Sequence, residues 1–389
     1  MTDMTSHRIL IKPKKSFFLL GPRATGKSTW LKQQVKPDFI IDLLKARDFQ
    51  KYSTNLNLLS EVIDGNPTFK IIVIDEIQKL PELLDEVHSL IFDSDNELQF
   101  ILTGSSARKL KKKNVNLLAG RALIRYFHPF SALEIESKFK IDLALKFGML
   151  PQVWNLESED EKKDYLTSYV DTYLKEEIQQ EAAVRSLPSY LLFLEHFALR
   201  NAQVINIQNL AGEIGIPRTT INGYLDILEQ TLLGFKLAPI HLKAKVKEVT
   251  TAKFYFFDTG VVRALAKQLD DNMGSEKGTL LETLVLHELK TYSDYFLQRY
   301  EINFWGTPSE NEVDFIVSKG KSRIGIEVKA SKKWDKSFNK GLDALIAAGK
   351  IKQAYGVYLG EEKLKNSNIN VFPLKKFISF LHEGKLFSV

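Results

Sequence analysis

Short apolar runs separated by polar, helix-patterned segments occupy the first third of the 389-residue chain. These runs are residues 17–20 (FFLL), 39–43 (FIIDL), 71–74 (IIVI) and 98–102 (LQFIL). Strands that are apolar at nearly every position are typical of a parallel sheet whose two faces are both covered by helices. The pattern therefore predicts an α/β domain with a parallel sheet over residues 1–130.

Residues 131–200 show helical periodicity and are predicted to form a helical lid or linker. In the segments 169–180 (YVDTYLKEEIQQ) and 189–200 (SYLLFLEHFALR), apolar residues recur at steps of three and four. This spacing places them on one face of a helix.

A helix–turn–helix pattern follows. Residues 207–214 (IQNLAGEI) and 218–228 are predicted helices, joined by a turn at 215–217. Pro217 ends the turn, and proline is favoured where a helix begins. We expect a winged-helix-like segment over residues 201–265.

Residues 266–389 return to a mixed α/β pattern. An amphipathic helix at 280–290 precedes strand-like runs at 301–305, 312–317 and 323–329. The pattern predicts a second α/β domain in this part of the chain.

The composition is that of an ordinary globular protein, with 44% hydrophobic and 26% charged residues. A chain of this length is expected to form two or three domains. It contains no cysteine, which excludes disulfides, cysteine-based zinc sites and a thiol nucleophile. The net charge of +6 permits a nucleic-acid partner without requiring one.

Residues 1–16 lack the apolar stretch of a signal peptide. No apolar run reaches the roughly 20 residues that a membrane-spanning helix needs. A soluble cytoplasmic protein with no membrane partner is expected.

Residues 21–28 match the phosphate-binding pattern G-x-x-x-x-G-K-[ST], between a predicted strand and a predicted helix as the motif requires. The glycines let backbone N–H groups converge on phosphate oxygens, and the helix N-terminus favours an anion. Lys27 is expected to reach the β- and γ-phosphates, and Ser28 to ligate Mg²⁺. The predicted ATP-binding residues are Gly21, Pro22, Arg23, Ala24, Thr25, Gly26, Lys27, Ser28 and Thr29.

Two acids, Asp75 and Glu76, end the apolar run 71–74. Asp75 is expected to hold Mg²⁺, and Glu76 to orient and deprotonate the attacking water. A strand that ends in solvated acids is the alternative. The phosphate-binding loop about fifty residues upstream favours the catalytic interpretation.

A hydroxyl-rich turn, Thr103-Gly104-Ser105-Ser106, follows the next apolar run. Thr103 is a candidate to sense the γ-phosphate or the attacking water. An ordinary turn at the end of a strand is the alternative, because glycine and serine are common turn residues.

These motifs resemble those of the bacterial and archaeal AAA+ ATPases that carry a C-terminal domain of unknown function. The resemblance rests on GPRATGKS, IIVIDEIQKLP, FILTGSSAR and LAGR, in this order, and continues through YVDTYLKEEI, KFYFFDTGVVRAL, GTLLETLVLHEL, NEVDFIV and IGIEVKAS. It covers nearly the whole chain. It implies an N-terminal AAA-type ATPase domain, a winged-helix segment and a C-terminal fold similar to restriction endonucleases.

The resemblance also implies a homo-oligomer, a hexamer or other ring, in which Arg121 reaches a neighbour's γ-phosphate as an arginine finger. A surface arginine is the alternative for Arg121 without the resemblance. The chain departs from the family pattern at two places in the linker region. It has Gly148-Met149-Leu150-Pro151 where a glycine pair before the proline is usual, and Glu177 where an Arg-Asp pair is typical.

Strand alternation groups charged side chains in the C-terminal domain. Glu312, Asp314 and Ile316 are expected to share one face of their strand, and Glu327 and Lys329 one face of the next. A hairpin between the two strands would bring Asp314 beside Glu327.

Together with Glu282 on the preceding helix, Asp314, Glu327 and Lys329 resemble the PD-(D/E)xK nuclease arrangement. Clustered carboxylates suit a second divalent metal that polarises a scissile phosphate, and Lys329 would stabilise developing negative charge. A solvated charged strand face is the alternative for Glu327 and Lys329. An inactive binding platform is the alternative for the domain.

The second helix of the helix–turn–helix pattern offers polar side chains for DNA contact: Arg218, Thr219, Thr220, Asn222 and Tyr224. The segment 241–247 (HLKAKVK) alternates basic and apolar residues, which suits a wing strand with a cationic face along phosphates. Its basic residues are Lys243, Lys245 and Lys247. A protein-docking module is the alternative.

The leading hypothesis is Mg²⁺-dependent ATP hydrolysis coupled to a conformational change of a DNA-engaging winged-helix and nuclease-like region. One rival is a regulatory switch in which ATP occupancy controls a C-terminal domain that only binds DNA or protein. A second rival is a phosphotransferase, although Asp75 and Glu76 favour water as the acceptor.

Overall fold

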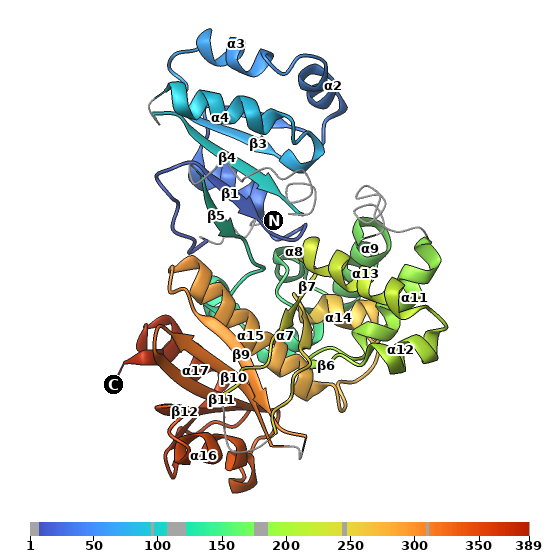
Figure 1. Ribbon diagram of the computed structural model, residues 1–389, viewed down its shortest axis with the longest axis vertical. Helices are drawn as coiled ribbons and strands as arrows, with labels where there is room; N and C mark the ends of the chain where they lie inside the picture. Colours follow the sequence, from blue (N-terminus) through green and yellow to red (C-terminus); the bar gives the residue numbers. More distant parts are fainter. Residues whose placement is uncertain are drawn as a thin grey trace. The chain divides into compact units, whose positions relative to one another are not determined.

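The computed structural model describes residues 8–94, 97–106, 122–174, 186–242, 247–308 and 311–388 (Figure 1). The chain divides into two compact units. The smaller unit consists of His7–Pro129 with Asp226–Leu233, and the larger of Phe130–Leu225 with Gly234–Val389. Among the described helices, none combines the length and the apolar character needed to cross a lipid bilayer.

A five-stranded parallel sheet with the order β2-β3-β4-β1-β5 forms the smaller unit. Its strands are β1 (Phe17–Leu20), β2 (Phe39–Asp42), β3 (Ile71–Asp75), β4 (Gln99–Gly104) and β5 (Leu123–Tyr126). The first four confirm the predicted apolar runs. The fifth was not predicted, because Leu123, Ile124 and Tyr126 of this edge strand are exposed and its sequence is not a continuous apolar run.

Helices cover this sheet and close its core (Figure 1). They are α1 (Lys27–Trp30), the π-helical turn η1 (Leu31–Val35), α2 (Ala46–Thr54), α3 (Leu58–Asp64), the 3₁₀ turn η2 (Ile77–Lys79) and α4 (Leu83–Asp93). In α4, buried residues at helical spacing meet buried residues of β3 and β4 in one cluster. The packed strands fix one edge of the sheet, where the loops after β1, β3 and β4 begin.

The larger unit starts with helices and a small antiparallel sheet of order β6-β8-β7. The helices are α6 (Ala132–Ile135), η4 (Glu136–Lys138), α7 (Ile141–Phe147), α8 (Pro151–Asn155), α9 (Glu159–Ser168), η5 (Tyr169–Leu174), α11 (Leu187–Ala198), α12 (Ile207–Ile214), α13 (Arg218–Gln230) and α14 (Thr259–Leu265). The residues of α13 from Asp226 onward belong to the smaller unit. The strands are β6 (Gln203–Val204), β7 (Gly234–Leu237) and β8 (Lys253–Phe256).

The predicted helix–turn–helix pair is confirmed at the level of its elements, as α12 and α13. Gly215 ends α12 in the left-handed conformation, with φ of 68°, which glycine adopts at little cost. The predicted wing strand at 241–247 is wrong for the residues that can be described. His241, Leu242 and Lys247 lie outside any strand, in the connection between β7 and β8, and residues 243–246 lie outside the described part of the chain.

A mixed six-stranded sheet with the order β13-β14-β12-β11-β10-β9 completes the larger unit. Its strands are β9 (Glu301–Gly306), β10 (Glu312–Lys319), β11 (Ser322–Lys329), β12 (Gln353–Tyr358), β13 (Leu364–Asn366) and β14 (Ile369–Pro373). The helices are α15 (Lys277–Tyr295), η6 (Lys336–Asn339), α16 (Lys340–Ala347), α17 (Leu374–His382) and η7 (Lys385–Phe387). The predicted hairpin is confirmed, since β10 and β11 pair in antiparallel fashion from Lys319 and Ser322 onward.

A register shift between Val313 and Ile316 interrupts the pairing of β10 with β9. Strict alternation would place Ile316 beside Asp314, but Ile316 belongs to the same buried core cluster as Val313. That part of the prediction is wrong, because an irregular pairing changes which side chains share a face.

Asp258 anchors the connection between α7 and α8 to the start of α14. One carboxylate oxygen accepts a hydrogen bond from the Met149 N–H at 2.6 Å, and the other accepts from Val261 N–H at 3.0 Å. Gly148 adopts φ of 81°, and a Cβ there would lie 2.0 Å from an Asp258 oxygen. Burial raises the pKa of Asp258 to about 6, against the opposing effect of these backbone donors. The close approach explains why glycine stands at position 148.

We predict that Asp258→Ala lowers the free energy of unfolding by about 2–4 kcal/mol, because it leaves buried N–H groups without an acceptor. The matched control is Asp335→Ala, since Asp335 also caps a helical turn through Ser337 N–H but is exposed. Urea denaturation of both variants tests this. Equal losses at the two positions would contradict an anchoring role for Asp258.

Candidate functional site

The loop after β1 has the backbone geometry of a phosphate cradle. Ala24 and Gly26 adopt left-handed conformations, with φ of 61° and 95°. A Cβ at Gly21 would lie 2.2 Å from the Phe127 carbonyl oxygen, so only glycine fits there. Within the loop, the Thr25 hydroxyl donates to the Pro22 carbonyl at 2.9 Å. The sequence thus curls the backbone at the edge of the sheet, immediately before the helical stretch that begins at Lys27.

Lys27 is buried, and its ammonium is held by the loop itself. It donates to the carbonyl oxygens of Gly21 at 2.7 Å and Pro22 at 3.0 Å. A positive charge is therefore fixed inside the loop that is expected to take anionic phosphates. The remaining predicted loop residues lie nearer the surface: Arg23 is half-buried, and Ala24, Ser28 and Thr29 are exposed.

Asp75 at the end of β3 joins the loops that follow β1 and β4. Its carboxylate accepts a hydrogen bond from the Ser28 hydroxyl at 3.0 Å and another from the Thr103 hydroxyl. Burial raises the pKa of Asp75, while the hydrogen bond from Thr103 lowers it. The structure thus brings together Ser28, Asp75 and Thr103 from three separate parts of the chain.

Glu76 occupies a left-handed backbone position, with φ of 59°. Its N–H donates to the Thr103 hydroxyl at 3.1 Å. Its carboxylate oxygen Oε2 accepts from the Gln78 side-chain amide and from the Ser105 hydroxyl, the latter at 3.2 Å. The two partners were not predicted. The available signal was the amide two residues after the acid, in the sequence Asp-Glu-Ile-Gln.

Arg8 is a further residue that sequence reasoning missed. Its guanidinium donates to the Thr25 carbonyl at 3.3 Å and to the His128 carbonyl, and lies 4.3 Å from the centre of the Phe127 ring. It therefore ties the phosphate-binding loop to the segment after β5.

These residues fit a nucleoside triphosphate with Mg²⁺. The loop supplies N–H groups and an ammonium for phosphate, and Ser28 with Asp75 supplies two neighbouring oxygens of the kind that Mg²⁺ prefers. The predicted arginine finger, Arg121, lies outside the described residues, so its position is untested.

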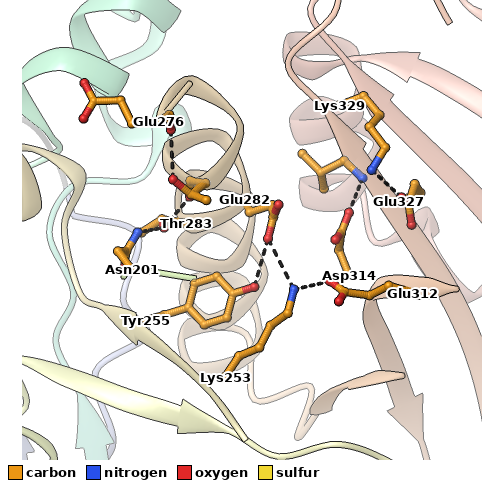
Figure 2. A network of polar contacts seen from close by, with 12 residues as sticks. Asn201, Lys253, Tyr255, Glu276, Glu282, Thr283, Glu312, Asp314, Glu327 and Lys329 are labelled. Atoms are coloured by element: carbon orange, nitrogen blue, oxygen red, sulfur yellow. Dashed lines mark hydrogen bonds and ion pairs between the residues drawn. The ribbon is translucent and has the colours of Figure 1, made fainter. Parts of the chain in front are cut away.

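A second polar network lies in the larger unit, between β8, α15 and β10 (Figure 2). Lys253 of β8 is buried, and its ammonium forms an ion pair with Glu312 and lies 3.7 Å from Glu282 of α15. The Tyr255 hydroxyl, two residues along β8, donates to Glu282 at 3.1 Å. Lys253 and Tyr255 were not predicted, although they alternate with Phe254 and Phe256 as a polar strand face does.

The hairpin brings the other predicted residues to the same network (Figure 2). Asp314 accepts a hydrogen bond from the Val328 N–H at 2.7 Å, which holds it beside Glu327. The Lys329 ammonium lies 2.5 Å from Glu327 Oε1, and the buried Oε2 has no hydrogen-bond partner in the described chain.

The charges of this network neutralise one another. Burial raises the pKa of Glu282 to about 8, and it also raises the pKa of Glu327 well above its usual range. Acidic neighbours, Glu282 first, raise the pKa of Lys253 against the opposing effect of burial. Within the described ranges, no three histidine, aspartate or glutamate side chains gather as a metal-ligand set. A lysine ammonium, Lys253, lies among the acids instead.

The predicted DNA-contacting helix is only partly available on the surface. Arg218, Thr219 and Asn222 of α13 are exposed. Tyr224 is buried, and its ring meets that of Tyr190 edge-on at 4.9 Å, so its proposed DNA contact is wrong. Of the predicted wing residues, Lys247 is exposed, while Lys243 and Lys245 lie outside the described residues.

Three family models match consecutive parts of the chain. Residues 13–136 match a model described as an AAA domain. Residues 138–272 match a domain of unknown function (DUF8612), and residues 277–377 match another (DUF4143). The first match indicates a nucleotide-binding domain of the ATPase type and agrees with the loop geometry.

Relatives occur in bacteria and archaea, and each is named as an uncharacterized protein. The chain is 23% identical to uncharacterized protein Rv2008c of Mycobacterium tuberculosis, over 90% of this chain and 78% of the relative. It is 27% identical to an uncharacterized protein of Haemophilus influenzae, over 73% and 70%. It is 25% identical to uncharacterized protein MJ1544 of Methanocaldococcus jannaschii, over 79% and 73%.

We predict that Lys253→Met destabilises the protein more at pH 9 than at pH 5. Without the ammonium the pKa of Glu282 rises further, because Lys253 lowers it. Below about pH 8 Glu282 is protonated in the folded wild type and in the folded variant alike, so the extra cost of a further raised pKa appears only above that value. At high pH the loss should reach about 3–5 kcal/mol, as for a buried pair that loses one partner.

Thermal unfolding at the two pH values tests this prediction. The control is Lys70→Met, which removes an exposed lysine paired with Glu97 at 3.1 Å. The same loss at pH 5 and pH 9 for Lys253→Met would contradict a charge-neutralising role.

Proposed function

We propose that the protein hydrolyses ATP with Mg²⁺ at the edge of the parallel sheet. One observation carries the proposal: the Ser28 hydroxyl of the phosphate-binding loop lies 3.0 Å from the Asp75 carboxylate at the end of β3. A phosphate-binding loop and an acid that meet at one point are the two parts that a P-loop NTPase needs to hold a metal-bound triphosphate.

The residues have separate tasks in this proposal. The loop N–H groups and Lys27 bind the phosphates, and Ser28 with Asp75 holds the metal. Bound Mg²⁺ would neutralise charge on the phosphate oxygens. Thr103 keeps Asp75 in place through its hydrogen bond. Glu76 orients the attacking water and accepts its proton.

The resemblance adds two proposals about assembly. The protein would form a hexamer or other ring, and Arg121 would reach the γ-phosphate bound by a neighbouring subunit. In this arrangement the ATPase rate per subunit should rise with protein concentration. Arg121→Ala should abolish that rise.

We predict that Lys27→Ala weakens both ATP binding and hydrolysis, because the loop loses its positive charge. Glu76→Gln should leave ATP binding close to wild type and lower kcat by about 10²- to 10⁴-fold, the usual contribution of a general base. Phosphate release and binding of a fluorescent ATP analogue measure the two effects. Lys32→Ala, on the exposed side of η1, is the control and should behave as wild type.

A Glu76→Gln variant that hydrolyses ATP at the wild-type rate would contradict the assignment of the base. Release of phosphate without a phosphorylated product separates hydrolysis from the rival phosphotransferase reaction.

We further propose that ATP turnover is coupled to DNA engagement by a winged-helix-like segment built from α11, α12, α13 and the β6-β8-β7 sheet. Support comes from Arg218, Thr219 and Asn222, which are exposed in the first turns of α13. The ATPase rate measured with and without duplex DNA tests the coupling, and stimulation should fall steeply with salt. A rate indifferent to nucleic acid would favour the regulatory switch.

The C-terminal domain is proposed as a nuclease-like platform that binds without cutting. Lys253 supports this, because its ammonium already lies where clustered carboxylates would otherwise need a divalent ion. The residues as arranged therefore fit a buried lysine better than a second metal, although the order Glu282, Asp314, Glu327 and Lys329 follows the nuclease pattern.

We predict that the purified protein leaves DNA and RNA intact with Mg²⁺ or Mn²⁺ under conditions in which it hydrolyses ATP. Gel electrophoresis of both substrates is the measurement, and Glu327→Gln is the matched variant. Metal-dependent cleavage by wild type that is lost in Glu327→Gln would show an active nuclease and contradict the platform.

A further inference from the structure

Gln78 and Ser105 surround one oxygen of Glu76. The Gln78 amide nitrogen donates to Glu76 Oε2 and to the Ser105 hydroxyl, the latter at 3.2 Å. The Ser105 hydroxyl in turn donates to the same Oε2 at 3.2 Å. All three side chains are buried, with exposed fractions of 6%, 5% and 1% for Glu76, Gln78 and Ser105. A closed ring of three hydrogen bonds in a buried setting restricts rotation of the carboxylate.

The orientation of the Gln78 amide follows from chemistry. A carboxylate only accepts hydrogen bonds, so the amide nitrogen must face Glu76. The amide oxygen then points the other way, towards Gly104, where it is buried without a hydrogen-bond partner among the described residues. A Cβ at Gly104 would lie 2.7 Å from that oxygen. Glycine at the end of β4 therefore makes room for Gln78.

The backbone of Glu76 is fixed independently. Its N–H donates to Thr103, and Thr103 also bonds Asp75. Thr103 near the end of β4 thus contacts the main chain of Glu76, and Ser105, just after the strand, contacts its side chain. The Gln78 amide and the Ser105 hydroxyl both donate to Oε2, and Oε1 accepts no hydrogen bond from the residues that the structure describes. That second oxygen is left to receive a proton from water.

We propose that Gln78 is the positioning residue of the hydrolytic base, holding Glu76 so that Oε1 faces the attacking water, with Ser105 completing the arrangement. This inference rests on the proposed ATPase function and adds a residue to it. Gln78 touches neither phosphate nor metal in this role and acts only through Glu76.

Gln78→Met is the sharpest test, because methionine keeps the length of the side chain and removes the donor. We expect kcat for ATP to fall by about 10- to 100-fold, the scale of loss for a misplaced catalytic group. The KM for ATP and the affinity for a fluorescent ATP analogue should change by less than about threefold, because the phosphate-binding residues are untouched. Gln50→Met, the same substitution on the exposed side of α2, is the control and should match wild type.

Two further variants separate positioning from a general structural role. Gly104→Ala leaves Gln78 in the sequence but displaces its amide, and should give the same loss of kcat at unchanged KM. In a Glu76→Gln background, Gln78→Met should cause no further loss beyond about twofold, because residues that act as one unit are not additive. A full additional loss in that background would overturn the inference.

The possible failures are distinguishable. If wild type and Lys27→Ala release phosphate equally slowly, the proposed ATPase function is wrong. If wild type is active and Glu76→Gln is inactive, but Gln78→Met keeps the wild-type kcat, only the inference about Gln78 is wrong. A rise of kcat in Gln78→Met also overturns it, because Gln78 would then restrain the base.

Discussion

The hydrogen bonds that Ser28 and Thr103 donate to the Asp75 carboxylate connect the loops after three neighbouring strands, β1, β3 and β4. Parallel strands that are buried on both faces all end at the same edge of their sheet, so residues far apart in sequence meet there. Burial raises the pKa of Asp75, which favours any partner that stabilises its charge, and a divalent cation beside Ser28 is such a partner. The proposed chemistry of the smaller unit depends on this junction.

Local patterns were sufficient for much of this unit. Continuous apolar runs predicted β1 to β4, and the loop pattern with Asp75 and Thr103 predicted groups that the structure brings together at the proposed nucleotide site. The partners of Glu76 could not be predicted, because Gln78 and Ser105 meet only after β3 and β4 have paired. The edge strand β5 was not predicted, because its side chains are largely exposed and its sequence is therefore not a continuous apolar run.

Periodicity was less reliable in the larger unit, where irregular pairing and tertiary packing override it. The register shift after Val313 moved Ile316 into the core, although simple alternation had grouped it with Asp314. Tyr224 lies on a helix with a polar face, yet its ring packs against Tyr190. The role of Lys253 was not predicted, because its partners Glu282 and Glu312 lie on other elements and come close to it only in the folded chain.

The position of Lys253 also bears on where the chain can be divided. This lysine belongs to the segment 138–272 matched by one family model, whereas Glu282 and Glu312 belong to the segment 277–377 matched by another. A fragment that starts after residue 272 would carry Glu282 and Glu312 without the ammonium of Lys253. The border between the two matched segments is therefore not a border between structural units, and the two segments should fold and unfold together as one cooperative unit.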